Sequence, residues 1–149
     1  MVAEYCGIHY FNLMTAKQPI RTFEDLDCWK ACRELRLYVA RVLVPALPRS
    51  ERYRLGDQML RAARSTTANI AEGYGRFHYL DNAKFCSNAR GSCWEVLDHI
   101  ISAGDEGLIR EDLCKQGQEL VQQAVRILNG YLHYLQRADR QRPAASPSP

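Results

Sequence analysis

Arginine side chains are the groups in this sequence best suited to binding chemistry, because each guanidinium presents a planar fork of donors that fits phosphate oxygens. Residues 49–76 hold six arginines against three acids, and arginine outnumbers lysine 16 to 4 in the whole chain. The net charge is only +3, since residues 95–119 are acidic, so total charge alone does not identify a nucleic-acid binder. The candidates for nucleic-acid contact are Arg49, Arg52, Arg54, Arg61, Arg64 and Arg76.

The same arginines have a second interpretation, as a solvated helix face. Asp57 stands four residues before Arg61, an order that favours an ion pair along one helix, and Arg61 could instead pair with Glu95. The C-terminal arginines could likewise follow a phosphate backbone or have no binding role. These are Arg137, Arg140 and Arg142.

Asn69 and Glu72 lie three residues apart, so they would share one face of a helix. A carboxylate beside an amide could act as a general base with its orienting partner. No His, Ser or second acid lies at catalytic spacing, so we expect a structural role for Asn69, Glu72 and Glu95. In that role Asn69 and Glu72 would satisfy helix-terminal and inter-helix hydrogen bonds, with Glu72 paired to a buried or half-buried arginine.

The cysteines are spaced for burial rather than for metal binding. Cys28 and Cys32 are four residues apart and Cys86 and Cys93 seven apart, so each pair repeats along one helical face. The histidines are scattered and do not complete a zinc ligand set. The sequence also lacks a phosphate loop, a nucleophile elbow and a dinucleotide fingerprint. We therefore expect reduced thiols, no bound metal or cofactor, and no enzymatic activity.

The segment Gly73-Tyr-Gly-Arg-Phe-His-Tyr79 interleaves aromatic rings with basic residues. Rings on a basic loop can stack on bases. More often such rings fasten the end of one helix to the start of the next, and we favour that interpretation.

Composition and periodicity predict long helices. With 46% apolar residues, nine glycines and six prolines, the chain has too few turn residues for a sandwich or barrel. Thr22 and Asp25 form a helix start signal, and Pro45 and Pro48 should end the first helix. The four expected helices run from Phe23 to Val44, from Ser50-Glu51 to a closing Gly73-Tyr-Gly75 with a left-handed glycine, from Tyr79 or Asp81 to Ala103, and from Arg110 to Arg137.

Short connections between these helices predict an all-α, antiparallel, left-handed up-down-up-down four-helix bundle. The bundle should span residues 22–137, after an undecided extension at 1–21 and before a disordered basic tail at 138–149. The apolar stripes of the third and fourth helices look broader than one core would use, which favours a homo-oligomer. No apolar run is long enough to span a bilayer and no signal peptide pattern begins the chain, so we expect a cytoplasmic protein without membrane contact.

Four segments carry a resemblance to a known family. They are Phe23-Glu-Asp-Leu-Asp-Cys-Trp-Lys-Ala31, Gln58-Met-Leu-Arg-Ala-Ala-Arg-Ser65, Asn69-Ile-Ala-Glu-Gly73, and Ala89-Arg-Gly-Ser92 with Glu95. Together they resemble the bacterial four-helix-bundle family named after the 23S rRNA intervening sequence, over about residues 22–137. One departure is Thr66-Thr67, where the family usually has Ile-Pro or a similar apolar pair.

The resemblance implies a homo-oligomeric, pentameric barrel. The same superfamily includes the accessory protein of diversity-generating retroelements, which assists a reverse transcriptase and binds nucleic acid through a basic surface. By analogy we expect a non-enzymatic accessory that binds RNA or an RNA–DNA hybrid and docks a partner such as a reverse transcriptase. The alternative is a structural, protein-binding scaffold encoded in an rRNA intervening sequence, whose acidic 95–119 region meets basic partners.

Overall fold

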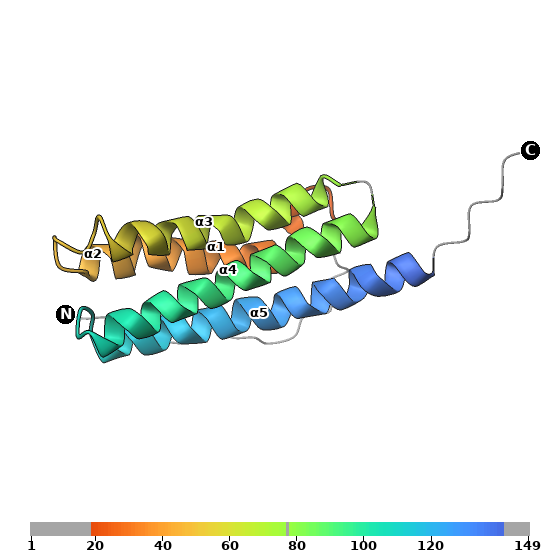
Figure 1. The fold of residues 1–149 in the computed structure, drawn as a ribbon. Helices are drawn as coiled ribbons and strands as arrows, with labels where there is room; N and C mark the ends of the chain where they lie inside the picture. Colours follow the sequence, from red (N-terminus) through yellow and green to blue (C-terminus); the bar gives the residue numbers. More distant parts are fainter. Residues whose placement is uncertain (1–18, 77, 142–149) are drawn as a thin grey trace, which may run out of the picture.

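A computed structural model describes residues 19–76 and 78–141, and within them the protein is helical with no strand (Figure 1). The prediction of an all-α chain with four long helices is thus confirmed. The extension up to residue 18 and the tail from residue 142 lie outside the described residues. The elements are η1 (Phe23–Asp25), α1 (Asp27–Tyr38), η2 (Val39–Leu43), α2 (Val44–Ala46), α3 (Leu55–Tyr74), α4 (Tyr79–Asp105) and α5 (Glu111–Arg140).

The predicted start signal is present at the beginning of the first helical segment. A carboxylate oxygen of Asp25 accepts hydrogen bonds from the backbone N–H groups of Arg21, at 2.9 Å, and Thr22, at 3.2 Å. These bonds hold the pKa of Asp25 below its usual value, since they stabilise the charged carboxylate. Leu26 has an extended backbone, so a 3-10 turn precedes α1 and the α-helix itself begins at Asp27 rather than at Phe23.

Pro45 does not end the first helix, contrary to our prediction. The chain stays helical from α1 through η2 and α2 to Ala46, and η2 is a π-helical turn. Proline lacks a backbone N–H, and a wider turn before it relieves the clash that an α-helical proline causes. Pro45 then stands at the beginning of α2, where proline is well tolerated.

The second long helix begins later than predicted, at Leu55 rather than at Ser50-Glu51. The carbonyl of Glu51 accepts hydrogen bonds from the N–H groups of Arg54, at 3.1 Å, and Gly56, at 2.9 Å. These hydrogen bonds satisfy the backbone groups locally, so residues 49–54 form turns instead of the first turn of the helix.

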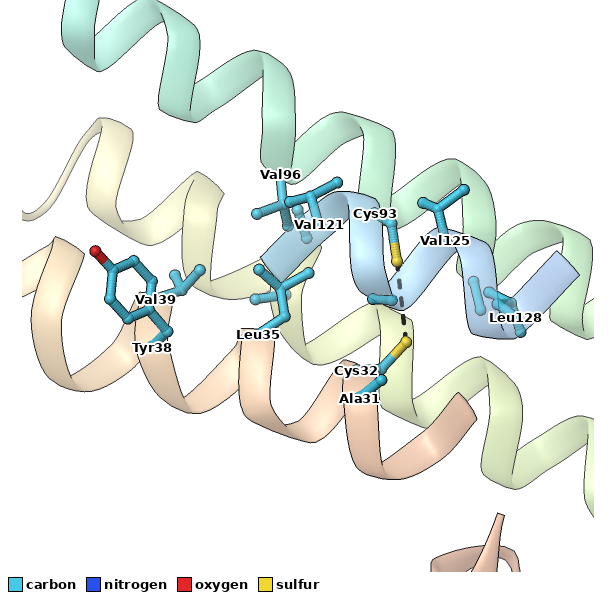
Figure 2. Close-up of a cluster of buried hydrophobic side chains, with 14 of the residues drawn as sticks. Ala31, Cys32, Leu35, Tyr38, Val39, Cys93, Val96, Val121, Val125 and Leu128 are labelled. Carbon is cyan, nitrogen blue, oxygen red and sulfur yellow. Dashed lines mark hydrogen bonds between the residues drawn. The ribbon is translucent and has the colours of Figure 1, made fainter. Parts of the chain in front are cut away.

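The long helices α1, α3, α4 and α5 lie side by side around one core (Figure 1). The α3 helix packs on α1 and α4, and α5 packs on α1 and α4. Buried apolar residues repeat along α4 at Cys86, Ala89, Cys93, Val96 and Ile100, and along α5 at Val121, Val125, Leu128, Leu132 and Leu135. Figure 2 shows part of this core, with Leu35, Val39, Cys93, Val96, Val121, Val125 and Leu128 converging.

The structure requires glycine at two positions, Gly73 and Gly107, but it does not require glycine at Gly75. Gly75 has a φ of −72°, so the predicted left-handed closing glycine is wrong. Gly73 is required for close packing instead, because a Cβ there would lie 2.9 Å from the Cβ of Phe85 and 3.0 Å from the carbonyl oxygen of Asn82. Gly107, in the α4–α5 connection, has a φ of +66°, which glycine adopts at least cost.

No helix in the described part of the chain has the length and apolar character needed to cross a membrane.

Candidate nucleic-acid interface

The arginines between α2 and α3 have different surroundings. Arg52 donates from Nε to the carbonyl of Leu47, at 3.1 Å, and from Nη2 to the carbonyl of Pro45, at 2.8 Å. Arg54 lies 4.0 Å from Glu51, whereas the exposed Arg49 makes no ion pair within the described residues. Arg52 therefore fastens the connection to the end of α2, which leaves fewer of its donors for a ligand.

Two predicted arginines pair with an acid of α3, Arg61 from within the helix and Arg76 from the connection after it. Arg61 lies 3.3 Å from Asp57, as one of our two interpretations predicted. Arg76 pairs with Glu72 and its guanidinium lies 4.7 Å from the centre of the Phe85 ring, a cation–π contact. Arg64 is exposed and, among the residues that the structure describes, has no acidic partner. Only part of the predicted set therefore presents uncompensated charge.

These ion pairs leave the arginines accessible. The side chains of Arg61 and Asp57 are 72% and 57% exposed, and exposed pairs stabilise a protein by only about 0–1 kcal/mol. A phosphate can compete for such a guanidinium, but it must approach the neighbouring carboxylate as well. Unpaired arginines are for that reason the stronger phosphate sites.

Sequence analysis missed a contact between α1 and α3 that involves Arg36. Its Nη1 donates to the hydroxyl oxygen of Thr67 at 2.9 Å, and Thr67 is 2% exposed. The Thr67 hydroxyl in turn lies 3.3 Å from the carbonyl oxygen of Arg64. The two residues are 31 positions apart, so no local spacing reveals the contact.

The departure from the apolar family pattern at residues 66 and 67 was the available signal. Thr66 turns its hydroxyl back to the carbonyl of Ala63, at 2.7 Å, and is fully buried. Thr67 supplies the acceptor for Arg36. A buried hydroxyl needs a partner, so a polar residue in an apolar line indicates one nearby.

Asn69 and Glu72 do not both face a neighbouring helix, so that prediction is wrong in part. Asn69 donates to Ser65 of its own helix, to the carbonyl at 2.9 Å and the hydroxyl at 3.0 Å. The Ser65 hydroxyl then lies 2.9 Å from that of Ser92, which links α3 to α4. Glu72 stays on the surface with Arg76, which is exposed and neither buried nor half-buried.

Glu95 does not pair with Arg61, which is engaged by Asp57 instead. One carboxylate oxygen of Glu95 lies 3.8 Å from Nε2 of His99, one turn further along α4. That nitrogen is buried and makes no hydrogen bond in the described structure. The acidic side chain therefore stays on α4 and leaves the α3 arginines unaffected.

At the two ends of the connection between α3 and α4, the ring of Tyr74 is half-buried and packs against the core, whereas Tyr79 is 40% exposed. Phe77 and Arg142 lie outside the described residues. Arg137 and Arg140 are exposed on the last turns of α5, which continues past the predicted end at Arg137.

The cysteines of the described residues are free and buried, and for the pairs Cys28 with Cys32 and Cys86 with Cys93 their spacing predicted the burial. They are Cys28, Cys32, Cys86, Cys93 and Cys114. Burial raises the pKa of Cys28 well above its usual value and that of Cys86 to about 12. Within the part of the chain that the structure describes, no three potential metal ligands gather. The thiols of Cys28 and Cys86 are therefore protonated near neutral pH, and a thiol is a poor nucleophile and a poor metal ligand.

These features define an all-helical protein whose long helices share one core and which exposes arginines on α3 and on the connection before it. Residues 24–130 match the family described as 23S rRNA-intervening sequence protein, and the chain belongs to this family. The match confirms the family predicted from the four sequence segments. No protein with a curated description matches the chain.

Proposed function

We propose that this protein is a non-enzymatic RNA-binding accessory that contacts RNA or an RNA–DNA hybrid through the exposed arginines of α3 and its preceding connection. The observation that carries the proposal is the exposure of these arginines, with Arg49 and Arg64 free of any acid among the described residues. The name of the family, which refers to 23S rRNA, supports an association with nucleic acid.

The proposal includes the assembly. An antiparallel up-down-up-down bundle closes into a homopentameric ring in the cytoplasm, where it docks a reverse transcriptase of a diversity-generating retroelement. Exposed apolar side chains support self-association, because Trp94 is 48% exposed, Ile101 42% and Tyr134 51%. A ring repeats each arginine once per subunit, which strengthens the field at its surface.

A second candidate function is a protein-binding scaffold without nucleic-acid contact. All seven acids of residues 95–119 are exposed, and Asp98, Asp105, Glu106 and Glu119 form no ion pair within the described structure. This acidic surface suits a basic protein partner.

The test is binding of a structured RNA to the full chain, followed by fluorescence anisotropy between about 50 and 200 mM salt. We expect affinity to fall steeply with salt. Replacing Arg54, Arg61 and Arg64 by glutamine should flatten the logarithmic slope by about one unit per lost phosphate contact. The melting temperature of the variant provides the folding control. Absence of salt-dependent RNA binding by the parent would contradict the proposal and favour the scaffold.

A further inference from the structure

We infer that the surface where α1 and α3 meet holds the main phosphate-binding site of this protein, formed by Arg33, Arg36 and Arg64, for one strand of a nucleic acid. We call these three residues the α1–α3 arginine site. The inference rests on the proposed function and deepens it, since it names the residues that contact phosphate. Arg33 and Arg36 are absent from the set that the sequence indicates.

The hydrogen bond between Arg36 and Thr67 fixes the centre of the site. Thr67 is buried, so its hydroxyl holds the guanidinium of Arg36 at the junction of the two helices, 2.9 Å away. Because arginine has five N–H donors, this bond leaves four for a ligand. A guanidinium already held in place loses less side-chain entropy when it binds a phosphate.

Helical periodicity places the other two arginines beside Arg36. Arg64 stands one turn before Thr67 on α3, and its carbonyl oxygen lies 3.3 Å from the Thr67 hydroxyl. Arg33 stands one turn before Arg36 on α1. Both side chains are exposed, whereas Arg36 is half-buried. Three arginines from two helices therefore lie along the junction of α1 and α3.

The charge of this site is uncompensated within the described residues. None of its three arginines forms an ion pair there, in contrast to Arg54 and Arg61. The nearest acid in sequence, Glu34, directly follows Arg33 and projects about 100° around α1 from it, and it lies on the opposite side of α1 from Arg36. A phosphate bound between Arg36 and Arg64 meets donors that form no ion pair within the described residues.

Acids on α3 are also distant from the site. Asp57 precedes Arg64 by seven residues, about 10 Å along the helix axis, and is engaged by Arg61. Glu72 follows Arg64 by eight residues and is paired with Arg76. The α3 residues three or four positions from Arg64 are Leu60, Arg61, Thr67 and Ala68, and none of them is acidic. Arg64 therefore has no acid beside it on α3.

The test compares two double variants with the same loss of charge. Arg33→Gln with Arg36→Gln removes two members of the site, and Arg54→Gln with Arg61→Gln is the matched control. With a single-stranded RNA oligonucleotide as probe, we expect the first variant to lose at least about tenfold in affinity at low salt. It should also lower the salt slope by about two units, and the control should change both quantities less.

Single substitutions separate binding from folding. Arg33→Gln changes an exposed residue without a hydrogen bond in the described structure, so its melting temperature should match the parent while its affinity falls. Thr67→Val keeps every charge but removes the acceptor that positions Arg36, and it should weaken binding with an unchanged salt slope.

Two results would overturn the inference. If the control double variant loses as much affinity as the first, or if the first binds like the parent, the α1–α3 arginine site is not the main phosphate site and the proposed function survives. If the parent itself shows no salt-dependent binding to either the oligonucleotide or a structured RNA, the proposed function fails together with the inference.

Discussion

Cys32 on α1 and Cys93 on α4 meet inside the bundle with their sulfur atoms 3.9 Å apart (Figure 2). Both side chains are fully buried, and both thiols are free. The contact joins two helices that otherwise pack mainly against α3 and α5. The hydrogen bond that Cys93 forms with Cys32, together with burial, raises the pKa of Cys93. The pair thus belongs to the core and is closed to solvent.

We predict that the buried thiols resist alkylation until the protein unfolds. At about pH 8 iodoacetamide should leave Cys28, Cys32, Cys86 and Cys93 unmodified, since the reagent attacks the thiolate and needs access to the sulfur. Peptide mass spectrometry of protein treated in buffer and in urea measures this directly. A Ser87→Cys variant, with its new thiol at an exposed position, supplies the control that should react at once. Equal labelling of Cys93 and the control thiol in buffer would show that the core opens readily.

We also predict that the protein loses stability in alkali. Burial raises the pKa of Cys86 to about 12, from a usual value of 9.0. It likewise raises the pKa of Tyr131 to about 12, from 10.0. Between these values the folded state keeps the protons while the unfolded state releases them. The contribution of the two groups to the free energy of unfolding is therefore fully present below about pH 9, and it declines as the pH rises toward 12.

Each such group lowers the free energy of unfolding by about 1.4 kcal/mol per pH unit between its pKa in the unfolded state and its pKa in the folded state. Urea unfolding from about pH 8 to 11 measures the decline. The Cys86→Ala variant should start from a lower free energy of unfolding but lose it more slowly. A free energy that stays level over this interval would contradict the assigned pKa directions.

Two helical glycines should respond to alanine in opposite directions. At Gly73 a Cβ would lie 2.9 Å from the Cβ of Phe85, so Gly73→Ala should cost about 1–3 kcal/mol by overpacking. At Gly130 a Cβ would meet nothing within 4 Å, so Gly130→Ala should add up to about 1 kcal/mol through helix propensity. Chemical unfolding of the two variants measures the difference. A stabilised Gly73→Ala protein would show that α3 and α4 can separate at no cost.

Local patterns in the sequence predicted the helices and their buried faces, because helical periodicity is a property of neighbouring residues. The spacing of Cys28 and Cys32 indicated a buried line, and both are buried. Helix ends were harder to predict. The π-helical turn η2 accommodates Pro45. The α3 helix begins later than predicted because the carbonyl of Glu51 closes a turn, and no residue type in this segment predicts that turn.

The candidate interface was predicted less well, since its geometry depends on contacts between distant segments. The pair of Arg61 with Asp57 follows from a spacing of four residues and was predicted. The contact of Arg36 with Thr67 depends on how α1 packs against α3, and local spacing contains no information on that packing. The same holds for Arg52, whose acceptors are backbone carbonyls that the sequence does not distinguish.

Arg52 and Arg49 provide the last prediction, because they are near neighbours with different surroundings. Arg52 donates to the carbonyls of Leu47 and Pro45, whereas Arg49 makes no hydrogen bond or ion pair in the described structure. Arg52→Gln should lower the free energy of unfolding by about 0.5–1.5 kcal/mol, the contribution of a hydrogen bond that is partly exposed. Arg49→Gln should stay within about 0.5 kcal/mol of the parent.

The two variants should also differ in RNA binding, in the opposite order. Within the described residues the side-chain donors of Arg49 are free, so Arg49→Gln should lower the salt slope if RNA reaches this connection. Arg52→Gln should change the slope less, since two of the nitrogens of Arg52 are already engaged by carbonyls. Urea unfolding and anisotropy titrations on the same protein samples measure both effects. Equal stability of the two variants would show that the Arg52 hydrogen bonds do not hold the connection, and Arg52 would then rank with Arg49 as an available phosphate contact.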